Sequence, residues 1–145
     1  MTMCGLIIGL FGIDQYIKEQ IEKQPEDYKK KKGKCTIRKC HNKGIMYSIG
    51  KENPEQVKLV SGMMFFFLFF KWIISRRKSR VERVSWALLV AGAMGNVWDR
   101  IKRGYVVDYI HMDCNVLRKI VFNFADVCIA IGGIMLLVKE CLKRK

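Results

Sequence analysis

Residues 120–138 read IVFNFADVCIAIGGIMLLV, an almost wholly apolar run in which Asn123 and Asp126 stand out as polar side chains. A surface helix of a soluble protein carries polar residues between its apolar ones, so a run this uniform belongs in lipid or in a deeply buried core. Similar runs occupy 2–17, 59–70 and 84–98. A chain of 145 residues is too small to bury four such helices in water, which predicts a membrane protein.

The expected fold is an all-α membrane protein with four transmembrane helices and a small extracytoplasmic, partly extended (β-like) loop region. The spans are expected at about 3–18, 57–75, 84–101 and 120–139, with the loop at 19–56, in a single membrane domain. A spanning helix needs roughly 17 to 25 residues. The two middle runs reach that length only if flanking cations such as Lys71 and Arg83 extend toward the membrane surface.

The chain is strongly basic, with 27 Lys and Arg against 13 Asp and Glu. No aromatic-basic groove or zinc spacing accompanies this charge, so we expect anionic lipid headgroups rather than nucleic acid as the partner. The positive-inside rule places the dense basic segments 73–83 and 139–145 in the cytoplasm, together with both chain termini. The Lys-rich loop 19–56 conflicts with this assignment, but the rule weakens with loop length. The first apolar segment lacks the features of a cleaved signal peptide and is expected to be retained.

The six cysteines do not form an evident disulfide framework, since Cys4, Cys128 and Cys141 lie in or beside predicted spans. In the outer loops Cys35 and Cys40 could pair with each other or with Cys114, although free thiols are the simpler interpretation. Their spacing matches no common zinc site.

Two acids in the last third of the chain have apolar surroundings. Asp126 has no Lys or Arg within six positions on either side, and Asp108 lies between Val107 and Tyr109. An ionisable side chain in a membrane segment is costly and is usually functional. The residues around Asp108 follow Gly104 and are rich in β-branched types, so we expect extended chain at the outer edge of the bundle. Both acids can then reach the same depth.

Two carboxyls brought together in a low-dielectric site cannot both ionise, so the pair shares one proton. One can then activate a water molecule while the other protonates a peptide carbonyl, as in aspartic proteases. The residues alone leave two other interpretations open. One is a small proton-coupled transporter that uses the same acids. The other is a structural polar network, in which Asp108 caps a helix or pairs with Arg100 or Arg103 and Asp126 belongs to a buried ion pair.

Four short motifs follow one another along the chain. They are IDQYIK at 13–18, HNKGIMYSI at 41–49, GAMGNVWDRIKRGYVVDYI at 92–110 and FNFADVCIAIG at 122–132. In this order they resemble the motifs of the lipoprotein signal peptidases, also called signal peptidase II. The resemblance covers most of the chain apart from 19–40, which is unusually rich in Lys, while Lys43 and Met46 replace smaller residues. We therefore expect the cover of the site to differ from the family pattern.

The resemblance implies two catalytic aspartates, which fall on Asp108 and Asp126. It implies an endopeptidase that removes the signal peptide from a prolipoprotein just before the diacylglyceryl-modified cysteine, with no cofactor and no metal. It also implies a multi-pass protein of the bacterial cytoplasmic membrane with its active site near the outer face. We expect a monomer. A homologue that binds lipopeptide without cutting it stays an alternative.

The resemblance also marks supporting or substrate-binding residues. These are Asp14, Lys18, Asn42, Gly44, Asn96, Asp99, Arg100, Asn123 and Ala125. The amides of Asn96 and Asn123 can hold the aspartates or the substrate backbone, although a helix-packing contact is an equally open interpretation. Gly92 and Gly95 are expected to allow close helix approach.

Two charged pairs have a structural interpretation. Asp14 and Lys18 are four residues apart on one helix face, so they are expected to pair within the helix, and the resemblance places Asp14 at the border of the site. For Asp99 and Arg100 we expect a structural ion pair rather than direct chemistry, with Arg100 anchoring Asp99, Asp108 or a lipid phosphate.

Overall fold

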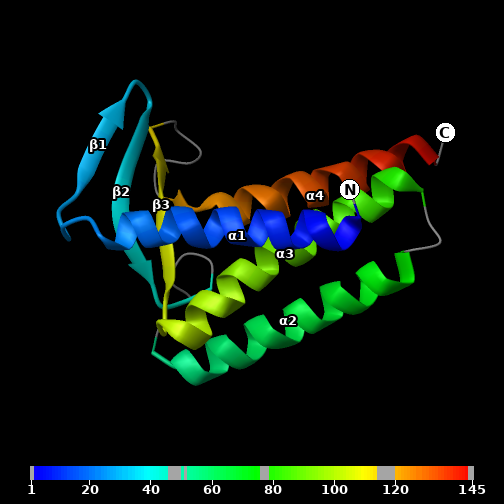
Figure 1. Ribbon diagram of the computed structural model, residues 1–145, viewed down its shortest axis with the longest axis horizontal. Helices are drawn as coiled ribbons and strands as arrows, with labels where there is room; N and C mark the ends of the chain where they lie inside the picture. Colours follow the sequence, from blue (N-terminus) through cyan, green and yellow to red (C-terminus); the bar gives the residue numbers. More distant parts are fainter. Residues whose placement is uncertain (1, 46–49, 51, 76–78, 114–119, 144–145) are drawn as a thin grey trace.

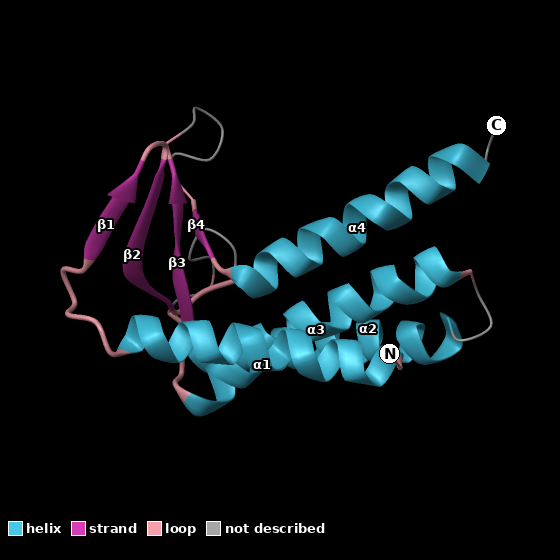
Figure 2. Cartoon of the chain, turned by 45° about the horizontal axis from the view of Figure 1, so that its top comes forward, coloured by secondary structure: helices cyan, strands magenta, loops and turns pink. Residues whose placement is uncertain are grey.

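Four long helices lie alongside one another, and a small sheet lies across one end of them (Figure 1). The computed structural model describes residues 2–45, 50, 52–75, 79–113 and 120–143. The elements are α1 (Met3–Glu22), β1 (Lys29–Lys32), β2 (Cys35–Asn42), α2 (Pro54–Ile74), α3 (Arg80–Lys102), β3 (Val106–Met112), β4 (Val121–Phe122) and α4 (Phe124–Lys143). Both chain ends lie at the end of the bundle away from the sheet (Figures 1 and 2).

The sheet joins two distant parts of the chain. Its order is β1-β2-β3-β4 with antiparallel neighbours, so the hairpin between α1 and α2 pairs with the strands between α3 and α4 (Figure 2). In this register Cys40 lies opposite Asp108. The edge strand β1 is a run of four exposed lysines, a composition that discourages an edge from pairing with other chains. The prediction of a mostly helical chain with a small extended region is confirmed.

Helix α3 lies at the centre of the bundle and packs against the other three helices. Small residues permit this close packing. A Cβ atom added at Gly92 would lie 2.4 Å from the carbonyl oxygen of Ala125 on α4, and one added at Gly95 would lie 2.4 Å from Asp14 Oδ2 on α1. Such distances are below any normal contact, so only glycine fits there. The expectation that Gly92 and Gly95 allow close helix approach is confirmed.

The outer face of α2 is strongly apolar. Its exposed large hydrophobic residues include Leu59, Val60, Met63, Met64, Phe66, Phe67, Phe69 and Phe70. Within the described ranges, α2 is the one helix that is long and apolar enough, by length and composition, to cross a membrane. The arrangement of four spans stays a prediction. α1 and α3 carry the charged residues Asp14, Lys18 and Asp99, although packing buries all three.

The described cysteines of the sheet, Cys35 and Cys40, are free thiols in the structure. Met46 and Cys114, together with residues 76–78 of the basic segment 73–83, lie outside the described residues.

Candidate active site

Asp108 and Asp126 meet where the sheet rests on the end of the bundle. Asp108 lies on β3 and is 4% exposed, whereas Asp126 lies in the first turn of α4 and is half-buried. The segment around Asp108 is a strand, as its β-branched residues predicted. It follows Gly104, whose φ of 81° lets the chain turn out of α3 into the sheet.

The position of Asp126 follows from the way α4 begins. The backbone N–H of Asp126 donates to Asn123 Oδ1 at 3.0 Å, and the backbone N–H of Asn123 donates to Asp126 Oδ2 at 3.1 Å. This is a reciprocal capping arrangement, which satisfies two N–H groups that the start of a helix otherwise leaves unpaired. The helix dipole also stabilises negative charge in the first turn.

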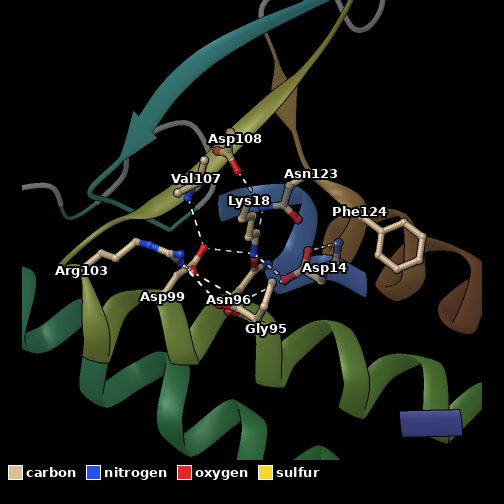
Figure 3. Close-up of polar contacts among 12 residues, drawn as sticks. Asp14, Lys18, Gly95, Asn96, Asp99, Arg103, Val107, Asp108, Asn123 and Phe124 are labelled. Carbon is tan, nitrogen blue, oxygen red and sulfur yellow. Dashed lines mark hydrogen bonds and ion pairs between the residues drawn. The ribbon is translucent and has the colours of Figure 1, made fainter. Parts of the chain in front are cut away.

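Three asparagine amides hold the two carboxyls (Figure 3 labels two of them, Asn96 and Asn123). Asn123 Nδ2 donates to Asp108 Oδ1 at 2.7 Å, and Asn42 Nδ2 donates to Asp108 Oδ2 at 3.1 Å. Asn96 Nδ2 donates to Asp126 Oδ1 at 2.8 Å. Asn123 therefore contacts both acids. Its Nδ2 donates to Asp108, and its side-chain oxygen and backbone N–H form the capping arrangement with Asp126. The expectation that Asn96 and Asn123 hold the aspartates is met by their contacts.

The electrostatic environment of Asp108 favours its protonated form. Burial is the largest cause and, together with the nearby charge of Asp126, raises the pKa of Asp108 to about 7. The hydrogen bonds from Asn42 and Asn123 and the charge of Lys18 act in the opposite direction but are smaller. Such a pair can hold one proton and donate it to a bound substrate.

A buried ion network lies directly beneath the acids. Lys18 Nζ lies 2.8 Å from Asp14 Oδ2 and 3.0 Å from Asp99 Oδ2. Arg103 pairs with the other oxygen of Asp99, Oδ1. Asp99 Oδ2 also accepts a hydrogen bond from the backbone N–H of Val107 at 3.2 Å. The predicted pairing of Asp14 with Lys18 within α1 is confirmed. The network ties α1, α3 and β3 together.

Arg100 does not behave as predicted. Its Nη2 donates to the carbonyl oxygen of Gly44 at 2.7 Å and its Nη1 to that of Asn96 at 3.2 Å, whereas the cations that pair with Asp99 are Lys18 and Arg103. Of the three partners considered for Arg100, Asp99 is wrong, because adjacent residues on a helix point in different directions. Arg100 instead secures the turn after β2.

Gly44 and Ala125 act through their backbones. The N–H of Gly44 donates to Asn42 Oδ1 at 3.0 Å, which leaves the amide nitrogen of Asn42 for Asp108. The N–H of Ala125 donates to Asp14 Oδ1 at 3.1 Å. Asp14 therefore borders the site by anchoring the first turn of α4, next to Asp126.

Sequence reasoning did not single out two residues around the site. Gln15 Nε2 donates to Asp14 Oδ2 at 3.2 Å, and the Tyr109 hydroxyl accepts from the N–H of Phe124 at 3.1 Å. Arg103 was considered as a partner of Asp108 but pairs with Asp99. Gln15 carried a usable signal, because it interrupts an apolar run beside Asp14. Within the described ranges, no three or more His, Cys, Asp or Glu residues gather as a group that could hold a metal ion.

The fold is that of a bacterial membrane enzyme. A bacterial membrane enzyme solved by the in meso method at 2.3 Å resolution superposes with a TM-score of 0.89 over 99% of this chain and 89% of the other, at 22% identity. A second, solved by the same method at 1.9 Å, gives 0.83 over 95% and 91%, at 23% identity. At these identities the likeness defines the class of fold alone.

The chain belongs to the signal peptidase II family: the family described as Signal peptidase (SPase) II matches residues 6–142. It is 35% identical to the lipoprotein signal peptidase of Caldicellulosiruptor bescii over 140 residues, covering 95% of this chain and 89% of the relative. It is 30% identical to that of Buchnera aphidicola, covering 94% and 91%. Membership in this family makes the chain a peptidase of lipoprotein processing.

Proposed function

We propose that the protein is a membrane aspartic endopeptidase that removes the signal peptide from diacylglyceryl-modified prolipoproteins, cutting before the lipid-modified cysteine. Family membership supports removal of the signal peptide from prolipoproteins. The observation that carries the mechanism is the double contact of Asn123, which holds Asp108 by its amide nitrogen and Asp126 by the capping arrangement. Two acids held this way form a dyad that can act together on a water molecule and a peptide bond.

In the proposed mechanism the two acids have different starting states. Asp108 is the more buried and carries the shared proton, while Asp126 is ionised and receives hydrogen bonds from Asn96 and Asn123. Asp126 takes a proton from water as the water oxygen attacks the peptide carbonyl carbon, and Asp108 gives its proton to the carbonyl oxygen. When the C–N bond breaks, Asp126 protonates the leaving nitrogen and Asp108 takes back the proton from the oxygen. Both acids return to their starting states.

The same proposal includes the arrangement in the membrane. All four helices cross the bilayer, both termini lie in the cytoplasm, and the sheet with the dyad lies at the outer face. Two features support this: the chain ends lie opposite the sheet, and the basic residues Arg80, Arg83, Lys139 and Lys143 belong to the helix ends on that side (Figure 1). The exposed lysines of β1 then face anionic headgroups of the outer leaflet. The enzyme acts as a monomer.

The pH dependence of cleavage should report the proton on Asp108. This acid must be protonated to donate, and its pKa is raised to about 7. The rate should therefore fall as the pH rises through about 7, whereas an ordinary carboxyl would already be ionised near pH 4. The measurement is kcat/KM between pH 5 and 9 in detergent. A rate that stays constant up to pH 9 would contradict the assignment of Asp108 as the acid.

A cleavage assay tests the function itself. The purified protein is incubated with a prolipoprotein that carries the diacylglyceryl group and with the same prolipoprotein lacking it. We expect only the modified form to be cut, immediately before the modified cysteine, as read by mass spectrometry, and a chelator should have no effect. Binding without cleavage would favour the non-cleaving homologue. A carrier would need acids along a path open to both faces, whereas Asp108 and Asp126 lie at one end of the bundle.

A further inference from the structure

Lys18 is the most deeply buried cation next to the proposed dyad, and ion pairing explains only part of its contacts. Its side chain is fully buried on α1. Its ammonium group has three N–H donors and three acceptors: Asp14 Oδ2, Asp99 Oδ2 and, at 3.1 Å, the amide oxygen of Asn96. The first two contacts neutralise charge. The third contact, with the neutral amide of Asn96, does not neutralise charge.

The third contact determines which way the Asn96 amide faces. The two ends of an asparagine amide have nearly the same shape, so packing alone does not distinguish them. An ammonium group has only donors, so the atom of Asn96 that faces Lys18 must be the oxygen. Asn123 Nδ2 donates to the same oxygen at 3.1 Å. The amide nitrogen of Asn96 must then face Asp126, to which it donates at 2.8 Å (Figure 3 shows Lys18 beside Asn96).

We propose that Lys18 is a positioning residue for the reaction: it holds the Asn96 amide so that the amide nitrogen donates to Asp126 and keeps this carboxylate available as the base. The inference rests on the proposed function of the dyad. Without Lys18 only Asn123 Nδ2 holds the Asn96 oxygen, so the amide can turn over more easily. A turned amide presents its oxygen to Asp126, which repels the ionised carboxylate and accepts a hydrogen bond from the protonated one. Loss of Lys18 therefore favours the protonated and inactive form of the base.

Other charges around the dyad stay in place when Lys18 is replaced. Asp126 is near Asp108, Arg100 and Tyr109, all on β3 or α3. Around the ammonium group itself lie the carboxylates of Asp14 and Asp99, and Arg103 pairs with the second of these. The four charges of this network sum to zero, so removing Lys18 alone leaves one uncompensated negative charge. A second variant, with Asp14→Asn added, therefore restores the charge balance.

The decisive test is a double-mutant cycle on kcat. Lys18→Met removes the donors and the charge, Asn96→Ala removes the amide, and the third variant carries both changes. We expect Lys18→Met to lower kcat roughly 10- to 100-fold with little change in KM. This is less than the roughly 10²- to 10⁴-fold contribution of an acid–base group, because Asp126 itself is still present. The double variant should match Asn96→Ala to within about twofold, because Lys18 acts through Asn96. Effects that multiply in the double variant would overturn the inference.

Two further measurements keep the test decisive. If Lys18→Met does not fold, the neutral variant Lys18→Met with Asp14→Asn restores the charge balance and retains an oxygen for the N–H of Ala125, and the cycle is repeated on that background. The acid limb of the kcat/KM profile should move to higher pH in either Lys18 variant. An unchanged profile and kcat, with only a lowered melting temperature, would show a purely structural role. Wild-type cleavage is measured in the same assay, so failure of the proposed function is seen separately.

Discussion

Replacing either Asp108 or Asp126 by Asn should abolish cleavage of the lipid-modified prolipoprotein. Asn has the shape of Asp but can neither take a proton from water nor return one to the leaving nitrogen. One general acid–base group contributes roughly 10²- to 10⁴-fold to a rate, and each member of this dyad acts in both halves of the reaction. We therefore expect a loss of at least about 10⁴-fold in kcat. The measurement is the fraction of substrate converted in a long incubation with excess enzyme.

The control is Asp27→Asn, which makes the same chemical change at an exposed position before β1. This variant should cleave at the wild-type rate. The two dyad variants should keep the wild-type melting temperature to within a few degrees, because Asn can still accept one of the two hydrogen bonds at each site. Substantial cleavage by either folded dyad variant would remove that aspartate from the mechanism.

Gly92→Ala should have the next largest effect, on both stability and cleavage. The added Cβ would lie 2.4 Å from the backbone oxygen of Ala125 and 2.7 Å from a side-chain carbon of Ile129, so α4 must move away from α3. Overpacking of this kind costs about 1–3 kcal/mol, more than the gain of up to about 1 kcal/mol from replacing a helical glycine by alanine. The displaced segment carries Asp126. A shift of about 1 Å at a reacting group can lower a rate about 100-fold.

The matched control for Gly92→Ala is Gly133→Ala on α4, where the added Cβ would meet nothing within 4 Å. That change should leave cleavage unaffected and hold or slightly raise the melting temperature. Thermal unfolding in detergent and the cleavage rate are measured for both variants. A Gly92→Ala protein as stable and active as the Gly133→Ala protein would contradict the close packing of α3 on α4 around the site.

Local sequence features predicted the elements that carry the proposed site. The apolar runs predicted the four helices, and the β-branched residues around Asp108 predicted extended chain. The pairing of Asp14 with Lys18 was predictable because residues four apart on a helix are neighbours. Each of these features depends on residues close together in the chain.

Contacts between distant segments could not be predicted in this way. The pairing of β2 with β3 brings Cys40 opposite Asp108, although 68 positions separate them in the sequence. The contact of Arg100 with the carbonyl oxygen of Gly44 depends on where the turn after β2 comes to lie. A long charged side chain has several partners within reach, and only the packed backbone selects among them.

The sequence by itself determined that two acids have apolar surroundings, Asp108 in an extended segment and Asp126 at the start of an apolar helix. Such segments tolerate an acid only at high cost, and the motifs around both acids are specific. The tertiary structure alone decided how the acids are held: Asn123 between them, Asn96 turned by Lys18 toward Asp126, and Asn42 on Asp108. The reason is that a hydrogen bond depends on donor and acceptor atoms meeting within about 3 Å. Five segments separated along the chain supply those atoms, and only their packing brings them together.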